Sequence, residues 1–167
     1  MARAATPAIA ALLADGTEHQ ILRYQHDPRA ASFGDEAVTE LAAAHGLDPA
    51  QIFKTLILAV PGGLAVAVLP VPSKLSLKAA AAALNVPKAA MADRAAAERS
   101  TGYVLGGISP LGQRRALPTV IDSSALRVLV GFITREPKIP VRIVNPSPSV
   151  TRVVEFAGLK GPFGLAD

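Results

Sequence analysis

The chain has 167 residues, a length that fits one domain with a substantial core. It contains no cysteine, which excludes a disulfide framework, thiolate metal sites and a cysteine nucleophile supplied by the protein. Lys and Arg number 17 against 13 Asp and Glu; this net charge of +4 suits a polyanionic partner such as nucleic acid, but it also fits an ordinary, slightly basic surface.

The first 24 residues predict a short helix followed by a strand. Thr6-Pro7 is typical of a helix N-cap with proline at the first helical position, and Gly16 is a typical helix end. We expect a strand over the stretch EHQILRY, residues 18–24.

Two helix starts follow in the next 30 residues. Asp35 is a candidate cap for a helix that reaches about Ala44 and is broken by Gly46. Residues 48–51, DPAQ, combine an Asp cap, proline at the first position and glutamine at the third, which is close to a capping box.

Lys54 stands where this helical turn gives way to a strand. The apolar segments TLILAV and LAVAVLPV flank Pro-Gly-Gly at 61–63, a signal for a β-hairpin between two central strands covered by helices. A lysine at this point either extends its ammonium group to water, which is the commoner case, or brings it to a partner, because an unpaired buried charge is costly.

The rest of the chain mixes helices and strands without strict βαβ alternation. Ser76 and Asp93 are candidate caps of two alanine-rich helices, and a glycine-rich segment, a strand at 119–122, apolar segments at 126–134 and 140–144 and a final short helix at 150–156 follow. We therefore expect an α/β fold of the α+β type: a single domain over residues 1–167, with a curved, mixed, mostly antiparallel or barrel-like sheet surrounded by helices. No stretch approaches a membrane span or a targeting segment, so we expect a cytoplasmic protein.

Most catalytic and metal motifs are absent. The three histidines, His19, His26 and His45, lack the spacing of a metal site, and no metal or cofactor is expected. Ser109 resembles a hydrolase serine only in part, because Pro110 removes the backbone N–H that usually helps to form the oxyanion hole.

The glycine-rich segment TGYVLGGISPLG, residues 101–112, nearly imitates a phosphate-binding loop. Gln113 and Arg114 stand where such a loop has its Lys and Ser or Thr, which disfavours a nucleoside triphosphatase. Gly106 and Gly107 allow backbone N–H groups to approach a ligand closely, although a tight structural turn is an equally good interpretation.

Several segments together resemble the YbaK family, and within it the bacterial Cys-tRNA(Pro) deacylase group, which is related to the editing domain inserted in prolyl-tRNA synthetases. They are YQHDP at 24–28, FGDEAV at 33–38, DPAQIFKTL at 48–56, LAVAVLPV at 64–71, KAAMAD at 88–93 and STGYVLGGISPLGQRRALPTVID at 100–122. The resemblance implies a mixed α/β fold on a curved sheet. It also implies a free-standing enzyme that hydrolyses mischarged tRNA, together with a transient complex of tRNA and prolyl-tRNA synthetase.

The resemblance also implies roles for individual residues. Lys54 corresponds to the key functional lysine of the family and is the expected catalytic residue. The expected substrate-binding residues are Tyr24, Phe33, Thr55, Gly106, Gly107, Ser109 and Thr134, and the candidates for tRNA contact are Arg114, Arg115 and Lys138. The chain departs from the family at residues 134–138, where TREPK replaces a serine followed by a glycine-rich turn, and this affects the expected substrate range.

An aminoacyl ester is already activated, so an enzyme without a competent nucleophile can still cleave it by positioning and charge stabilisation. Similarity to cysteine-specific members implies attack by the thiol of the substrate itself; direct attack by water is the alternative. A non-catalytic module that binds aminoacyl-tRNA or a synthetase, and a deacylase for another small amino acid such as Ala, stay open. The incomplete serine motif disfavours a small-molecule esterase.

Overall fold

The computed structural model describes residues 6–23 and 33–122. The chain divides into two compact units, residues 1–125 and 126–167, and every described residue belongs to the first. The segments expected at 126–134, 140–144 and 150–156 lie outside the described residues, and the organisation of the chain as one domain stays a prediction.

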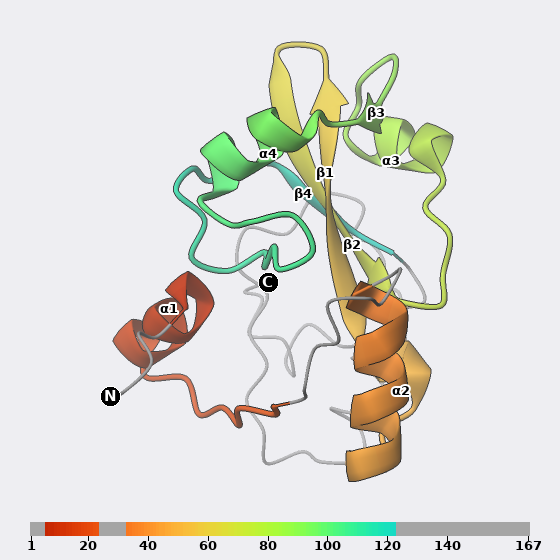
Figure 1. The fold of residues 1–167 in the computed structure, drawn as a ribbon. Helices are drawn as coiled ribbons and strands as arrows, with labels where there is room; N and C mark the ends of the chain where they lie inside the picture. The colour runs from red at the N-terminus through yellow and green to blue at the C-terminus, as the bar shows by residue number, and fades with distance from the viewer. Residues whose placement is uncertain (1–5, 24–32, 123–167) are drawn as a thin grey trace, which may run out of the picture. The chain divides into compact units, whose positions relative to one another are not determined.

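A long β-hairpin forms the centre of the fold (Figure 1). Strand β1, Phe53–Val60, pairs antiparallel along its whole length with β2, Gly63–Pro70, so that Lys54 stands opposite Leu69. The turn between them requires glycine, because Gly62 has a φ of +87°. The hairpin predicted from the apolar segments and the Pro-Gly-Gly turn is confirmed.

Two short strands extend this hairpin into a sheet with the order β3-β1-β2-β4. Strand β3, Ala90–Met91, is antiparallel to β1, and β4, Thr119–Ile121, is parallel to β2. The expected mixed, mostly antiparallel sheet is confirmed. Within residues 6–23 and 33–122 the sheet is open, with β3 and β4 at its edges, and does not close into a barrel.

Helices cover both faces of the sheet because both central strands are apolar on both sides. Helix α3, Leu77–Ala83, contributes Ala80 to a cluster with Leu58, Ala65 and Ala67. Helix α4, Arg94–Thr101, contributes Ala97 to a second cluster, with Ile57 and Val66 on the opposite face. Small alanine side chains let each helix lie close to the strands.

The predicted caps of these helices are confirmed. The Ser76 hydroxyl accepts a hydrogen bond from the Ala79 N–H at 3.2 Å, and the Asp93 carboxylate accepts one from the Ala96 N–H at 3.1 Å. Each cap satisfies one N–H group that the first turn of a helix leaves without a partner.

The segments before the sheet agree with the sequence in part. Helix α1, Pro7–Asp15, is capped by Thr6, and Gly16 ends it in the left-handed conformation. Helix α2, Phe33–His45, contains Asp35 as its third residue, so the prediction of Asp35 as the cap is wrong, whereas the predicted end before Gly46 is confirmed. The 3₁₀ turn η1, Pro49–Gln51, has the complete capping box expected from its sequence.

The strand predicted at 18–24 is wrong over its described part, residues 18–23, which have no regular structure. A strand needs a neighbour to pair with, and the strands next to β1 and β2 are supplied by other segments. Ile21, the apolar residue at the centre of the predicted strand, is 48% exposed. The local sequence alone therefore does not produce a strand here.

None of the helices in the described ranges is long and apolar enough to cross a membrane.

Candidate functional site

Lys54 is the second residue of β1 and is half-buried. Its Nζ donates a hydrogen bond to the main-chain carbonyl of Val71, at 2.8 Å. The same residue, Val71, donates its N–H to the Ile52 carbonyl at 2.8 Å, which ties the end of β2 to the entry of β1. The ammonium group of Lys54 is therefore hydrogen-bonded within the protein. One hydrogen bond leaves two of the three ammonium donors for a ligand.

Successive side chains of β1 point to opposite faces of the sheet. Lys54 shares its face with Leu58, the face that α3 covers, whereas Thr55 shares its face with Ile57. Ile108, which follows Gly107, packs against the Ile57 cluster. The described contacts thus bring the glycine-rich segment to the face of Thr55, and the direct contact of Lys54 is with Val71.

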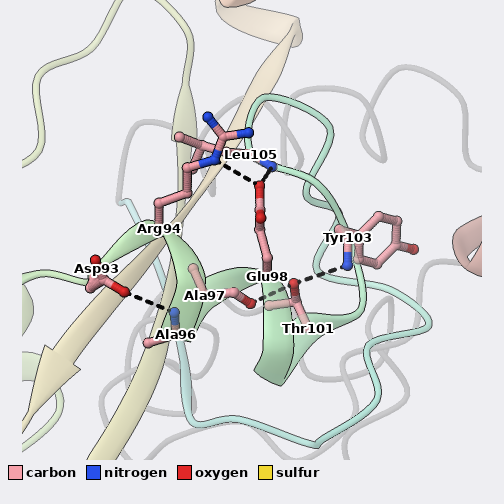
Figure 2. Close-up of polar contacts among 8 residues, drawn as sticks. All are labelled: Asp93, Arg94, Ala96, Ala97, Glu98, Thr101, Tyr103 and Leu105. Carbon is pink, nitrogen blue, oxygen red and sulfur yellow. Dashed lines mark hydrogen bonds and ion pairs between the residues drawn. The ribbon is translucent and has the colours of Figure 1, made fainter.

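Residues 102–112, here called the glycine loop, are held by side chains of α4 (Figure 2). The Glu98 Oε1 atom accepts hydrogen bonds from the Leu105 N–H at 2.9 Å and from Arg94 Nε at 3.0 Å. The Thr101 hydroxyl donates to the Ala97 carbonyl at 2.8 Å and accepts from the Tyr103 N–H at 3.2 Å. These bonds fix the backbone immediately before Gly106.

The far side of the glycine loop is also tied down. The Tyr103 hydroxyl donates to the Leu111 carbonyl at 2.7 Å, and Gln113 Nε2 donates to the Ser109 carbonyl at 2.8 Å. The Ser109 hydroxyl accepts from the Leu111 N–H at 3.1 Å. Ser109 therefore stabilises a turn, in agreement with its weak standing as a nucleophile.

The two glycines expected to present N–H groups differ. Gly107 donates its N–H to the Val104 carbonyl at 3.1 Å, which closes a turn. Gly106 is exposed and has a φ of +90°, and none of the hydrogen bonds described within residues 33–122 uses its N–H. Gly106 is thus the better donor for a ligand.

The hydrogen bonds that Glu98 accepts from Leu105 and Arg94, here called the clamp on the glycine loop, involve two charged side chains. The Leu105 N–H holds the pKa of the Glu98 carboxyl below its usual value, and Arg94 acts in the same direction through a hydrogen bond and its charge. Glu98 is therefore ionised at neutral pH and accepts both bonds as a carboxylate.

The two neighbouring arginines expected to contact tRNA have different surroundings. Arg114 donates its N–H to the Thr101 carbonyl at 3.0 Å, and its side chain lies over Gly102, where a Cβ would stand 2.9 Å from the Arg114 Cγ. Arg115 is exposed and lines a groove together with Arg99. Arg99 was not predicted from the sequence, because no local pattern shows that α4 brings it to the same groove as Arg115.

Three expected site residues, Tyr24, Thr134 and Lys138, lie outside the described residues. Phe33 begins α2, but its side chain is not among those described. Over residues 6–23 and 33–122, no group of three His, Cys, Asp or Glu side chains could hold a metal ion.

Comparison with known proteins gives one family match. The model of the family described as "Aminoacyl-tRNA editing domain" matches residues 35–134. This range includes Lys54 and the whole glycine loop.

One relative has a name that describes an activity. The Enterococcus faecalis protein named "Putative Cys-tRNA(Pro)/Cys-tRNA(Cys) deacylase EbsC" is 36% identical over 86 residues, which are 51% of this chain and 52% of that protein. The chain thus spans about half the length of the curated relative it matches.

Several solved structures have a similar fold, among them the following two. The hypothetical protein APE2540 has a TM-score of 0.59 and 25% identity, over 75% of this chain and 77% of the other. A protein described as "a putative trans-editing enzyme for prolyl tRNA synthetase" has a TM-score of 0.58 and 26% identity, over 72% of this chain and 73% of the other.

Proposed function

Because the chain belongs to the aminoacyl-tRNA editing domain family, the family that its motifs indicated, we propose that it is a deacylase acting in trans on mischarged tRNA, with Cys-tRNA(Pro) as its substrate. The observation that carries the proposal is the match over residues 35–134, which contains both Lys54 and the glycine loop. The name of the E. faecalis relative supports cysteine as the amino acid.

In this proposal Lys54 anchors the terminal adenosine of the tRNA or its phosphate. Its hydrogen bond to Val71 and its place in the paired part of β1 hold the ammonium group in one position, so little ordering remains to be done when substrate binds. Tyr24, Phe33, Thr55 and Thr134 are the proposed walls of the aminoacyl pocket.

The Gly106 N–H is the proposed donor to the carbonyl oxygen on which charge develops. The thiol sulfur of the cysteinyl group attacks its own carbonyl carbon. A C–S bond forms, the ester C–O bond breaks, and the thiol proton passes to the released ribose oxygen. The cyclic thioester that leaves then reacts with water to give cysteine. The protein supplies no nucleophile in this scheme, in agreement with the structural role of Ser109.

The proposed reaction takes place in the cytoplasm, where the tRNA substrate is charged. A transient complex with prolyl-tRNA synthetase would place the deacylase where Cys-tRNA(Pro) is released. The name of the similar trans-editing structure supports this partner.

The test is to incubate the chain with a panel of aminoacyl-tRNAs that includes Cys-tRNA(Pro), Ala-tRNA(Pro), Pro-tRNA(Pro) and Cys-tRNA(Cys), and to follow loss of the ester. We expect the fastest loss with Cys-tRNA(Pro) and almost none with Pro-tRNA(Pro). A preference for Ala-tRNA(Pro) would support a deacylase whose amino acid is alanine instead of cysteine. It would also rule out attack by a substrate thiol.

Binding without ester loss across the whole panel would sink the enzyme assignment and favour the non-catalytic binding module. A Ser-tRNA(Pro) substrate separates the two mechanisms, because it offers a hydroxyl in place of the thiol. Thiol attack predicts that this substrate is cleaved far more slowly than Cys-tRNA(Pro), and equal rates would favour direct attack by water.

A further inference from the structure

A cavity lies at the end of the β-hairpin that is remote from Lys54. It is a groove of about 620 Å³ between the β1–β2 turn, the end of α3, the last turn of α4 and the segment that leads to β4. Its walls include Pro61, Leu84, Ser100 and Leu117, and Arg99 and Arg115 line it as well. We refer to it below as the arginine groove.

The charge of the arginine groove has one sign. The side chains that line it include two arginines and, within the described part of the chain, no carboxylate. Arg99 and Arg115 are both exposed, and neither takes part in the ion pair that Arg94 forms with Glu98 on the same helix. Arginine binds phosphate with two parallel N–H donors, which makes a phosphate group the natural ligand of this pair.

The distance between the groove and Lys54 sets a minimum size for a ligand that contacts both sites. Lys54 and Val60 are six residues apart on β1, and Val60 lines the groove, so the two sites are separated by about 20 Å along the strand. A single nucleotide cannot span this distance, whereas the acceptor end of a tRNA can. The apolar walls of the groove suit a sugar or a base beside the phosphate.

Resting on the proposed function, we propose that the arginine groove is a second contact for the substrate tRNA, in which Arg99 and Arg115 bind phosphodiester groups of the acceptor end while Lys54 binds the aminoacylated terminus. Arg115 and Arg99 are binding residues in this assignment, whereas the Arg114 side chain lies over Gly102.

The test compares the double variant Arg99→Gln, Arg115→Gln with a double variant that loses the same charge elsewhere, Lys78→Gln, Lys88→Gln. Lys78 and Lys88 are exposed and do not line the groove. Binding of uncharged tRNA is measured over a range of salt concentrations, and melting temperatures check that both variants fold.

We expect the arginine variant to bind tRNA about tenfold more weakly, as the loss of hydrogen bonds to a charged group predicts. The slope of the logarithm of affinity against the logarithm of salt concentration should fall by about 2, one for each lost phosphate contact. The variant Arg99→Lys, Arg115→Lys should recover part of both changes, because charge is retained without the two parallel donors.

A kinetic comparison separates this inference from the proposed function. The ratio of kcat/KM on Cys-tRNA(Pro) to kcat/KM on the 3′-cysteinyl ester of AMP should fall about tenfold in the arginine variant, with the change mainly in KM. The proposed function fails if the unaltered chain cleaves no aminoacyl ester. The groove assignment fails if the chain cleaves Cys-tRNA(Pro) but the variant Arg99→Gln, Arg115→Gln and the control Lys78→Gln, Lys88→Gln have the same tRNA affinity, salt slope and kcat/KM ratio. If the arginine variant loses a complex with prolyl-tRNA synthetase but binds tRNA as before, the groove binds a protein partner and the proposal of a tRNA contact is overturned.

Discussion

Lys54 and the glycine loop are held in place by different kinds of interaction. Lys54 lies in a strand whose eight residues are all paired with β2, and a single hydrogen bond to Val71 orients its side chain. The glycine loop is irregular backbone, and polar side chains of Glu98, Thr101 and Tyr103 hold it. The difference indicates that the lysine position depends on the core, whereas the loop depends on a few bonds that can be removed one at a time.

The largest expected effect comes from Lys54→Met, which removes the ammonium group and keeps most of the side-chain volume. The value of kcat/KM on Cys-tRNA(Pro) should fall by about 100-fold or more, as for loss of a charged group that contacts the reacting substrate. The free energy of unfolding should fall by about 1 kcal/mol, because one hydrogen bond is lost from a paired strand.

Lys78→Met is the control for this variant, since Lys78 is exposed on α3. Its deacylation rate should stay within about twofold, a difference too small to indicate a lost contact. Full activity of Lys54→Met would remove Lys54 from the site, and unfolding of this variant would show that the lysine is held for stability instead.

Gly112→Ala tests how closely the glycine loop approaches the beginning of α1. Gly112 has a φ of +64°, and an added Cβ would collide with the main chain of Pro7. The free energy of unfolding should fall by about 1–3 kcal/mol, measured by denaturant titration.

Gly16→Ala is a matched control for this variant. Gly16 has a φ of +71°, close to that of Gly112, and a Cβ there would meet nothing within 4 Å. A loss of stability as large as that of Gly112→Ala would mean that backbone conformation, and not the contact with Pro7, makes Gly112 necessary.

Glu98→Gln weakens the clamp on the glycine loop without removing its acceptor oxygen. The value of kcat should fall by about threefold to tenfold, because the N–H group of Gly106 is held less firmly once the bond from the Leu105 N–H is no longer charge-assisted. Glu98→Ala should lower kcat further, and an unchanged kcat in both variants would separate the clamp from catalysis.

The pH dependence gives the Glu98 prediction a second measurement. The folded state lowers the pKa of this carboxyl, so its contribution to stability is present above the unfolded pKa of about 4.3 and is lost as the pH falls through the lower folded pKa. The chain should therefore be more stable than Glu98→Gln at pH 7, and the two melting temperatures should converge as the pH falls below about 4. A constant difference down to pH 2 would contradict a role for the charge.

The smallest effect is expected for Ser109→Ala. This variant loses the acceptor for the Leu111 N–H in an exposed turn, which costs about 0.5–1.5 kcal/mol, and deacylation should fall by less than about threefold. Complete loss of activity in a variant that still folds would reinstate Ser109 as a nucleophile.

Local signals in the sequence predicted much of the fold. Thr6, Asp48, Ser76 and Asp93 each cap the helix or turn that their residue type predicts, because the interaction lies within the next three residues. The β1–β2 hairpin was predictable from two apolar runs and a Pro-Gly-Gly turn. The strand expected at 18–24 failed because pairing depends on which segments occupy the neighbouring positions in the sheet.

The family, the hairpin and the place of Lys54 at the beginning of a buried strand could be predicted from the amino-acid sequence, because motifs, caps and apolar runs are properties of adjacent residues. The tertiary structure was needed to show that Lys54 bonds to Val71, 17 residues away, and that Gly107, unlike Gly106, uses its N–H in a turn. It was also needed to show that Arg115 lines a groove with Arg99, whereas Arg114 lies over Gly102. Which groups meet in these contacts depends on how β1, α4 and the glycine loop pack together, and no single segment of the chain contains that information.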